Sequence, residues 1–220
     1  MSWDALVLAG GAARRLGGVD KPALTVGGQT LLDRVLAAVD GAREVIVVGP
    51  ARRVAVTRPV RWTRERPPGG GPVAALAAGL ELVCAPLVAV LAADLPFLTA
   101  ATVAALVRAV GGGDAGAGAG AGAGGGGGGG RDATGAGRTD DDPPWGALLV
   151  DPAGRHQYLT GVWRTSALRA RLPAVPAGAS MRSVLAGPRV LVLPADGRTT
   201  LDCDAPADLE RARGWARMGP

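Results

Sequence analysis

Short apolar runs alternate with segments of helical periodicity along most of this chain, and this alternation limits the folds that it can adopt. Apolar runs bounded by turn residues are typical of buried strands, whereas apolar residues repeated every three or four positions are typical of helices. The first half of the chain predicts strands over residues 5–8, 44–48 and 87–91, and helices over residues 30–39, 72–83 and 100–110. Strands separated by helices of about ten residues are typical of parallel sheets. We therefore expect an α/β fold, with a mostly parallel twisted sheet covered by helices on both faces.

A glycine-rich tract interrupts this order. Residues 111–130 read GGGDAGAGAGAGAGGGGGGG and offer almost no side chain that could be buried. Burial cannot offset the entropy cost of ordering such a tract, so we expect a disordered insertion over residues 111–142. Beyond it, the sequence predicts strands over residues 146–150, 158–163 and 190–193, and helices that start at Thr165 and Pro206. Residues 1–220 are interpreted as one domain with an insertion; two lobes divided at the tract are the alternative.

The charge and the cysteine content argue against several classes of protein. The formal net charge is +5, and 23 of the 24 basic residues are arginines. They are interleaved with carboxylates, which is typical of a solvated surface and not of a nucleic-acid interface. Cys84 and Cys203 form no CxxC pair and suit a reducing compartment. Without a basic leader or a run of ~18 apolar residues, the chain is expected to be cytoplasmic and to bind neither nucleic acid nor a membrane.

The first predicted strand ends in a glycine pair, within the sequence LVLAGGAARRLGGVDKPAL of residues 6–24. In α/β sheets, ligands bind at the carboxyl ends of the strands. Glycines at such a place let main-chain N–H groups approach a ligand, because no Cβ atom intervenes. The predicted ligand-binding residues of this loop are Leu8, Ala9, Gly10 and Gly11.

Basic residues follow in the same loop. Arg15 and Lys21, the only lysine in the chain, can meet a polyphosphate, the arginine as a fork and the lysine as a point charge. The spacing is neither that of a P-loop nor the G-x-G-x-x-G of a dinucleotide-binding fold. The alternative interpretation is a glycine-rich turn with solvated arginines.

Asp94 follows the predicted strand 87–91 in the sequence LVAVLAADLP. The carboxyl ends of parallel strands meet at one edge of a sheet, so Asp94 is expected near the glycine loop. Mg²⁺ is commonly held by one or two carboxylates together with substrate oxygens. A turn or helix-capping role is the alternative for Asp94 alone. Together with the glycine loop, Asp94 favours a Mg²⁺ site beside a nucleotide phosphate.

Four stretches of the chain resemble motifs of the MobA-like nucleotidyltransferases, and among them the molybdenum cofactor guanylyltransferases. They read LAGGAARRLGGVDKPAL, PPGGGPVAAL, VLAADLPFL and LDCDAPADLERA. The first motif of the family is L-A-G-G-x-x-x-R-M-G-x-x-D-K, and here only its Met is replaced, by Leu16. The resemblance covers almost the whole chain apart from the glycine tract. It implies a Rossmann-like nucleotidyltransferase fold.

The resemblance also implies an activity and its participants. The family transfers GMP from GTP to the terminal phosphate of molybdopterin and releases pyrophosphate. GTP and molybdopterin are thus the expected substrates, Mg²⁺ the expected cofactor, and other molybdenum cofactor biosynthesis or acceptor proteins the expected transient partners.

The functional residues of the family can be carried over one by one. The main chain of Leu8, Ala9 and Gly10 is expected to contact the nucleotide. Lys21 corresponds to the lysine that meets the phosphates, and Asp94 to the aspartate that binds the metal. The expected catalytic set is Lys21, Arg15 and Asp94, because these groups and the metal offset charge that moves onto the departing pyrophosphate. In the C-terminal motif, Asp202 and Asp204 are expected near the metal or the acceptor, with Asp204 as the further metal ligand.

Departures from the family motifs concern the base of the nucleotide. The aspartate that usually precedes the second motif is absent, and Glu65 is the residue that can replace it. Ala75 stands in place of a glycine, and Gly49 and Pro50 stand where the family has an asparagine. Base selection rests on such contacts. The alternatives are therefore a CTP-dependent molybdopterin cytidylyltransferase, a sugar-phosphate nucleotidyltransferase, or a non-catalytic nucleotide-binding accessory protein.

Five further polar and aromatic residues are left out of the expected catalytic set. His156 and Gln157 lie where the family presents a segment to the acceptor, and Trp145, Tyr158 and Trp163 could stack on a pterin. A lone histidine is more often a surface residue than a catalyst, and the aromatic residues are also explained by core packing.

Overall fold

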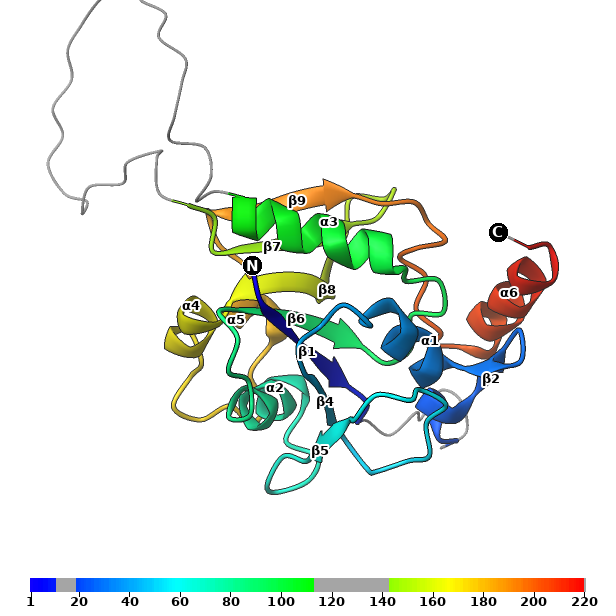
Figure 1. Ribbon diagram of the computed structural model, residues 1–220, viewed down its shortest axis with the longest axis horizontal. Helices are drawn as coiled ribbons and strands as arrows, with labels where there is room; N and C mark the ends of the chain where they lie inside the picture. Colours follow the sequence, from blue (N-terminus) through cyan, green and yellow to red (C-terminus); the bar gives the residue numbers. More distant parts are fainter. Residues whose placement is uncertain (11–18, 113–142, 220) are drawn as a thin grey trace, which may run out of the picture.

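The computed structural model describes residues 1–10, 19–112 and 143–219 of the chain. Gly11, Arg15 and residues 113–142 lie outside these ranges, so the roles predicted for the two residues and the disorder predicted for the tract stay predictions. The described residues form a seven-stranded sheet in the order β5-β4-β1-β6-β8-β7-β9 (Figure 1). Its strands are β1 (Trp3–Leu8), β4 (Val45–Val48), β5 (Arg61–Thr63), β6 (Leu87–Ala92), β7 (Gly146–Val150), β8 (His156–Arg164) and β9 (Val190–Pro194).

Strand β1 is buried on both faces of the sheet. It pairs in parallel with β4 on one side and with β6 on the other. Successive side chains of a strand point to opposite faces. Ala5 and Val7 accordingly pack into one hydrophobic cluster, and Leu6 and Leu8 into the cluster on the opposite face. A strand enclosed in this way needs the continuous apolar run that the sequence has there.

Helices cover both faces of the sheet (Figure 1). One face packs against α1 (Leu31–Ala38) and α3 (Ala100–Gly111), and the other against α2 (Pro72–Leu80), α4 (Thr165–Ala170) and α5 (Met181–Leu185). The predicted α/β class is confirmed by this arrangement.

The residues at the helix starts explain where the helices begin. Thr30 accepts a hydrogen bond from the backbone N–H of Asp33 at 3.0 Å, and Thr99 does the same for Thr102 at 3.1 Å. These N-caps satisfy backbone donors that have no partner inside α1 and α3. Helix α2 instead begins with Pro72, whose missing N–H is no loss in a first turn.

Strand β8 runs antiparallel to both of its neighbours, β6 and β7, whereas the other four strand pairs of the sheet are parallel. The turn between β7 and β8 is held by Asp151, which accepts the backbone N–H groups of Ala153 and Arg155, each at 2.9 Å. Because of this reversal, the start of β8 lies at the same edge as the carboxyl ends of β1 and β6. The sheet is thus mostly parallel, as predicted, with one reversed strand.

A smaller layer lies beside the sheet. It contains η2 (Lys21–Ala23), the hairpin of β2 (Thr25–Val26) and β3 (Gln29–Thr30), and helix α6 (Pro206–Arg217). Its apolar contacts form a satellite core, made of Val26, Leu31, Leu201, Cys203, Leu209 and Ala212. The satellite core joins the N-terminal segment that carries Lys21 to the C-terminal segment that carries Asp204.

The predicted strands and helices are all present, with ends shifted by a few residues at most places. Strand β5 lies in the arginine-rich segment before α2, where the sequence predicts no strand, and it pairs with β4. The β2–β3 hairpin and α5 were also not predicted. All of these elements are too short to show a hydrophobic period.

The two ends of the predicted insertion lie close together. Arg164 donates to the carbonyl oxygen of Val110 at 3.2 Å and to that of Pro144 at 3.0 Å. Helix α3 continues through Gly111, so the first residue of the predicted insertion is helical instead of disordered. None of the helices within the described ranges has the length and apolar character that crossing a membrane requires.

Candidate active site

The predicted nucleotide loop leaves the sheet at the carboxyl end of β1. The backbone stays in register for one further residue, since Ala9 N–H donates to Val48 O at 2.8 Å and Ala93 N–H donates to Leu8 O at 3.1 Å. Gly49 passes close by, and a Cβ atom there would lie 2.7 Å from the Ala9 carbonyl oxygen. Leu8 and Ala9 are buried, whereas Gly10 is exposed. The loop therefore leaves the core at Gly10.

Lys21 begins the short helix η2, which fixes its backbone. Pro22 is buried, and Ala23 N–H donates to Asp20 O at 2.9 Å. The Asp20 carboxylate receives two hydrogen bonds from Arg52, at 2.7 and 2.6 Å, and this pairing lowers the pKa of Asp20. Arg52 belongs to the loop after β4, and no sequence pattern indicates its role. Asp20 and Arg52 thus hold the segment that presents Lys21.

The Lys21 ammonium lies between two carboxylates that come from distant parts of the chain. Its Nζ donates to Asp94 Oδ2 and, at 2.5 Å, to Asp204 Oδ1. The Lys21 and Asp94 side chains are each 15% exposed, whereas Asp204 is 54% exposed. The contact brings together three residues that were predicted separately, from the N-terminal loop, the end of β6 and the C-terminal motif.

The segment that carries Asp204 is tied to the end of β6. Cys203 N–H donates to the Asp94 carbonyl oxygen at 3.2 Å, and the Cys203 side chain is buried in the satellite core. Burial raises the pKa of the Cys203 thiol to about 12, so the thiol stays protonated at neutral pH. Asp202 and Asp204 on either side of it therefore hold fixed places beside Asp94.

The electrostatics of the cluster reflect crowding of like charges. Loss of water around the carboxylate raises the pKa of Asp202, and the charges of Asp204 and Asp94 raise it further. Burial favours the neutral form of Lys21, yet attraction to Asp94 and Asp204 outweighs burial and raises the pKa of Lys21. The ammonium is therefore charged throughout the neutral range.

The donor set suits a hard divalent cation. Asp94 Oδ1 is buried and has no hydrogen-bond partner among the described residues. Across the described ranges, no group of three or more His, Cys, Asp or Glu side chains is arranged to hold a metal ion. Mg²⁺ does not require such a cage, because one or two carboxylates plus substrate phosphates commonly bind it. Asp94 and Asp204 fit that pattern.

Glu65 lies in the loop between β5 and α2, at the same edge of the sheet. Its side chain is buried, and its Oε1 accepts the Gly69 N–H at 3.0 Å. Its Oε2 is also buried but has no partner among the described residues. A buried acceptor without a partner is costly. The free oxygen therefore marks Glu65 as a residue that a bound donor can satisfy.

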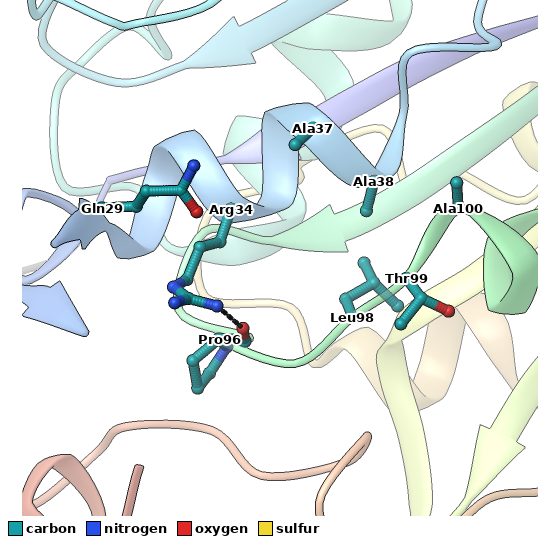
Figure 2. Close-up of a pocket in the computed structure, with 8 residues that line it drawn as sticks. All are labelled: Gln29, Arg34, Ala37, Ala38, Pro96, Leu98, Thr99 and Ala100. Atoms are coloured by element: carbon teal, nitrogen blue, oxygen red, sulfur yellow. Dashed lines mark hydrogen bonds between the residues drawn. The ribbon is translucent and has the colours of Figure 1, made fainter. Parts of the chain in front are cut away.

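A shallow pocket lies beside the segment that follows Asp94 (Figure 2). Its lining comes from β3, α1, the segment between β6 and α3, and the first residue of α3, and consists of Gln29, Arg34, Ala37, Ala38, Pro96, Leu98, Thr99 and Ala100. Arg34 Nη1 donates to Pro96 O at 3.1 Å, and its Nε donates to Val26 O at 2.8 Å. Arg34 therefore ties the segment after Asp94 to α1 and the β2–β3 hairpin. The sequence had not indicated this role.

The residues left out of the catalytic set divide between core and surface. Trp145 and Trp163 pack against each other with their ring centroids 5.1 Å apart and their planes tilted by 37°, and both are buried. His156 is exposed at the start of β8, with its ring 6.0 Å from that of Tyr158. None of these side chains hydrogen-bonds to Lys21, Asp94 or Asp204 in the part of the chain that the structure describes.

The sequence of this chain is similar to those of several curated proteins. A molybdenum cofactor guanylyltransferase from Acidiphilium cryptum is 40% identical over 89 residues, which are 37% of this chain and 43% of that protein. Another, from Bradyrhizobium sp., is 40% identical over 114 residues, 47% of this chain and 53% of that protein. The chain thus spans about half the length of the curated relatives that it matches.

Two solved structures share the fold across nearly their full length. Molybdopterin-guanine dinucleotide biosynthesis protein A from Archaeoglobus fulgidus superposes with a TM-score of 0.62 at 18% identity, over 98% of this chain and 99% of that one. A 2-C-methyl-D-erythritol 4-phosphate cytidylyltransferase from Thermus thermophilus superposes with a TM-score of 0.62 at 22% identity, over 99% of this chain and 100% of that one. The names of these two proteins point to different nucleotides and acceptors. The shared fold therefore does not indicate which nucleotide or acceptor this chain uses.

The family itself follows from the sequence match. The model of the MobA-like NTP transferase domain matches residues 5–192, which include Lys21, Asp94 and both halves of the sheet. The chain belongs to the family of MobA-like NTP transferase domains.

Proposed function

We propose that this protein transfers GMP from GTP to the terminal phosphate of molybdopterin and releases pyrophosphate. The observation that carries the proposal is the meeting of Lys21 with Asp94 and Asp204 at the carboxyl edge of the sheet, beside Leu8–Gly10. Membership of the MobA-like family and the names of its relatives support the choice of GTP and molybdopterin. A cytoplasmic location, and transient contacts with other molybdenum cofactor proteins, belong to the same proposal.

The chemistry requires positioning and charge stabilisation. An oxygen of the acceptor phosphate bonds to the α-phosphorus of GTP, and the bond from that phosphorus to the oxygen bridging to the β-phosphorus breaks. Pyrophosphate leaves with the electron pair. The acceptor phosphate is already an anion, so the chain need not supply a general base. Its task is to hold both substrates in line.

Each proposed residue has a part in that task. The main chain of Leu8, Ala9 and Gly10 binds the nucleotide, with Gly11 and Arg15 of the same motif. Lys21 donates to phosphate oxygens and offsets the charge that grows on the leaving pyrophosphate. Asp94, together with Asp204, would hold Mg²⁺. When bound there, Mg²⁺ neutralises and orients the phosphates.

We assign base selection to Glu65. Guanine presents neighbouring N–H donors on its pairing edge, whereas cytosine presents acceptors at the matching positions. A buried carboxylate with one free oxygen suits the donors and disfavours the acceptors. GTP is therefore the expected substrate, and preference for CTP would indicate the cytidylyltransferase alternative.

Calorimetry with GTP, CTP, ATP and UTP, with and without Mg²⁺, tests the nucleotide part of the proposal. We expect GTP to bind more tightly than the other three nucleotides. Its full affinity should require Mg²⁺. Glu65→Gln should weaken GTP binding by about tenfold, since it replaces an acceptor oxygen with an amide donor. If no nucleotide binds to the folded protein, the proposed function is wrong.

Turnover of GTP and molybdopterin tests the catalytic residues. Lys21→Ala and Asp94→Asn should each lower kcat by on the order of 10²-fold or more, the size of effect seen when a transition-state donor is lost. Asp40→Asn is the matched control, because Asp40 is exposed at the far end of α1. Wild-type turnover in a folded Lys21 or Asp94 variant would remove that residue from the mechanism.

A further inference from the structure

The contacts of Lys21 conflict with the role proposed for its two partners. Its ammonium donates to one oxygen of Asp94 and to one oxygen of Asp204. These two carboxylates are the ones assigned above to a divalent cation. Within the described residues, no other basic side chain pairs with either of them.

A lysine ammonium and a divalent cation cannot both use this place. Each needs the same carboxylate oxygens at contact distance, and two cations that close together repel strongly at a partly buried site. The arrangement with Lys21 between the carboxylates and an arrangement with a divalent cation bound to them therefore exclude each other.

The protein can change from one arrangement to the other by moving a side chain. The Lys21 backbone is fixed by buried Pro22 and by the Asp20–Arg52 pair. Its four-carbon stem ends in a compact charge that can rotate to a new acceptor. A triphosphate at the Leu8–Gly10 loop offers such acceptors.

We infer that Lys21 occupies the place of the divalent cation until a nucleoside triphosphate draws its ammonium away from Asp94 and Asp204. This inference rests on the proposed function and adds an order of events to it. The divalent cation alone binds weakly, and nucleotide and cation strengthen each other. By linkage, the coupling is equal in both directions. Lys21 thus has two tasks, to keep the carboxylates neutralised and then to serve the phosphates.

Binding of Mn²⁺ without nucleotide tests the exchange. Free Mn²⁺ is followed by electron paramagnetic resonance as protein is added. The wild type should bind weakly, and Lys21→Met should bind at least about tenfold more tightly, because one positive charge has left the site. Lys21→Arg, which keeps the charge, should bind as weakly as the wild type. Adding Asp94→Asn to Lys21→Met should abolish the gain, which locates the ion.

A second measurement uses the wild-type chain and does not depend on a variant's folding. Lys21 is the only lysine, so a protein grown with ¹³C-labelled lysine gives a single Cε signal in a nuclear magnetic resonance spectrum. Millimolar Mg²⁺ alone should leave that signal in place. GTP should shift it, as the ammonium moves from carboxylates to phosphates.

The outcomes separate this inference from the proposed function. If Lys21→Met binds Mn²⁺ no more tightly than the wild type, or if Mg²⁺ alone shifts the Lys21 signal, the exchange is wrong while GTP binding and turnover can still stand. If GTP does not bind to the wild-type protein, the proposed function fails. Tighter Mn²⁺ binding by Lys21→Met would still support the competition between lysine and metal.

Discussion

At the scale of single residues, Asp4 shows how a charge can be used inside a sheet. Its side chain is fully buried at the start of β1 and accepts two hydrogen bonds from Arg43, at 3.0 and 2.9 Å. It also accepts the backbone N–H groups of Glu44, Cys84 and Ala85. One carboxylate therefore connects β1 to the segments that lead into β4 and β6.

Asp4 should make stability depend on pH in the acid range. Burial opposes its ionisation, but the hydrogen bonds from Arg43, Ala85 and Cys84 prevail and lower its pKa below the ordinary 3.8. A lowered pKa contributes stability above pH 3.8, and this contribution is lost as the pH falls through the folded-state value. Asp4→Asn should lower the free energy of unfolding at pH 7 by about 2–4 kcal/mol, because Arg43 loses its charged partner.

Urea unfolding at several pH values checks this prediction. The difference between the wild type and Asp4→Asn should shrink as the pH falls from 3.8 through the lowered folded-state pKa of Asp4, where the folded carboxylate becomes protonated. Asp40→Asn on the exposed end of α1 should stay within about 0.5 kcal/mol of the wild type. A pH-independent difference would show that Asp4 acts through its shape and not through its charge.

At the scale of elements, the approach of α2 to the sheet depends on a glycine. A Cβ atom added at Gly79 would lie 2.2 Å from Leu6 Cδ1 and 2.9 Å from Val48 Cγ2. Both of these side chains are fully buried, so neither has space to move into. Gly79 therefore sets how closely α2 packs on β1 and β4.

A pair of glycine substitutions tests this packing. Gly79→Ala should lower the free energy of unfolding by about 1–3 kcal/mol, since overpacking exceeds the gain in helix propensity. Gly214 in α6 is the matched control, because its nearest neighbour to an added Cβ is 3.9 Å away. Gly214→Ala should raise stability by up to about 1 kcal/mol. Thermal and urea unfolding measure the stability of both variants. A Gly79→Ala variant as stable as the wild type would contradict the close packing of α2 on Leu6 and Val48.

Several elements, and part of the candidate site that they position, could be predicted from the sequence. Leu6 and Val7 belong to a short apolar run that is typical of a strand buried on both faces, and the end of that run located Leu8–Gly10 at the edge of the sheet. The meeting of Lys21 with Asp94 follows from that rule together with the family motifs. Asp204 lies too far along the chain for local patterns to place it, and its motif resemblance alone indicated it.

The unpredicted features depend on partners that only the folded chain brings together. The sequence around Asp4 does not indicate its role, since its hydrogen-bond donors come from residues 43–44 and 84–85. Arg52 is one arginine among many in its segment, and only the fold shows that it meets Asp20. The buried state of Glu65 likewise depends on the loop that returns Gly69 to it.

At the scale of the whole molecule, the sheet is continuous across the glycine tract. Strands β8, β7 and β9, all from beyond the tract, extend the sheet that β6 belongs to. Arg164 donates hydrogen bonds to Val110 and Pro144, which lie on the two sides of residues 113–142, and so holds these two segments together. The interpretation of the chain as one domain stays a prediction.

Replacing residues 113–142 by a short Gly-Ser linker should therefore leave a folded protein. We expect a single unfolding transition and a stability that is equal or higher by up to about 2 kcal/mol, because a shorter connection costs less entropy to close. Calorimetric unfolding and GTP titration of the shortened chain check both points. Two separate transitions would favour the two-lobe alternative, and failure to fold would show that the tract contributes to the core.

The central position of β1 has a consequence for the way the chain is made. Ala5 pairs with Val45 on one side and with Ala89 on the other, so β1 is synthesised before both of the strands that enclose it. At synthesis rates of about 5–20 residues per second, its second neighbour follows several seconds later. Pairing over such separations is also slow in itself. During that interval the edge of β1 that later pairs with β6 has no partner strand, and the nascent chain depends on its surroundings to keep that edge from other strands.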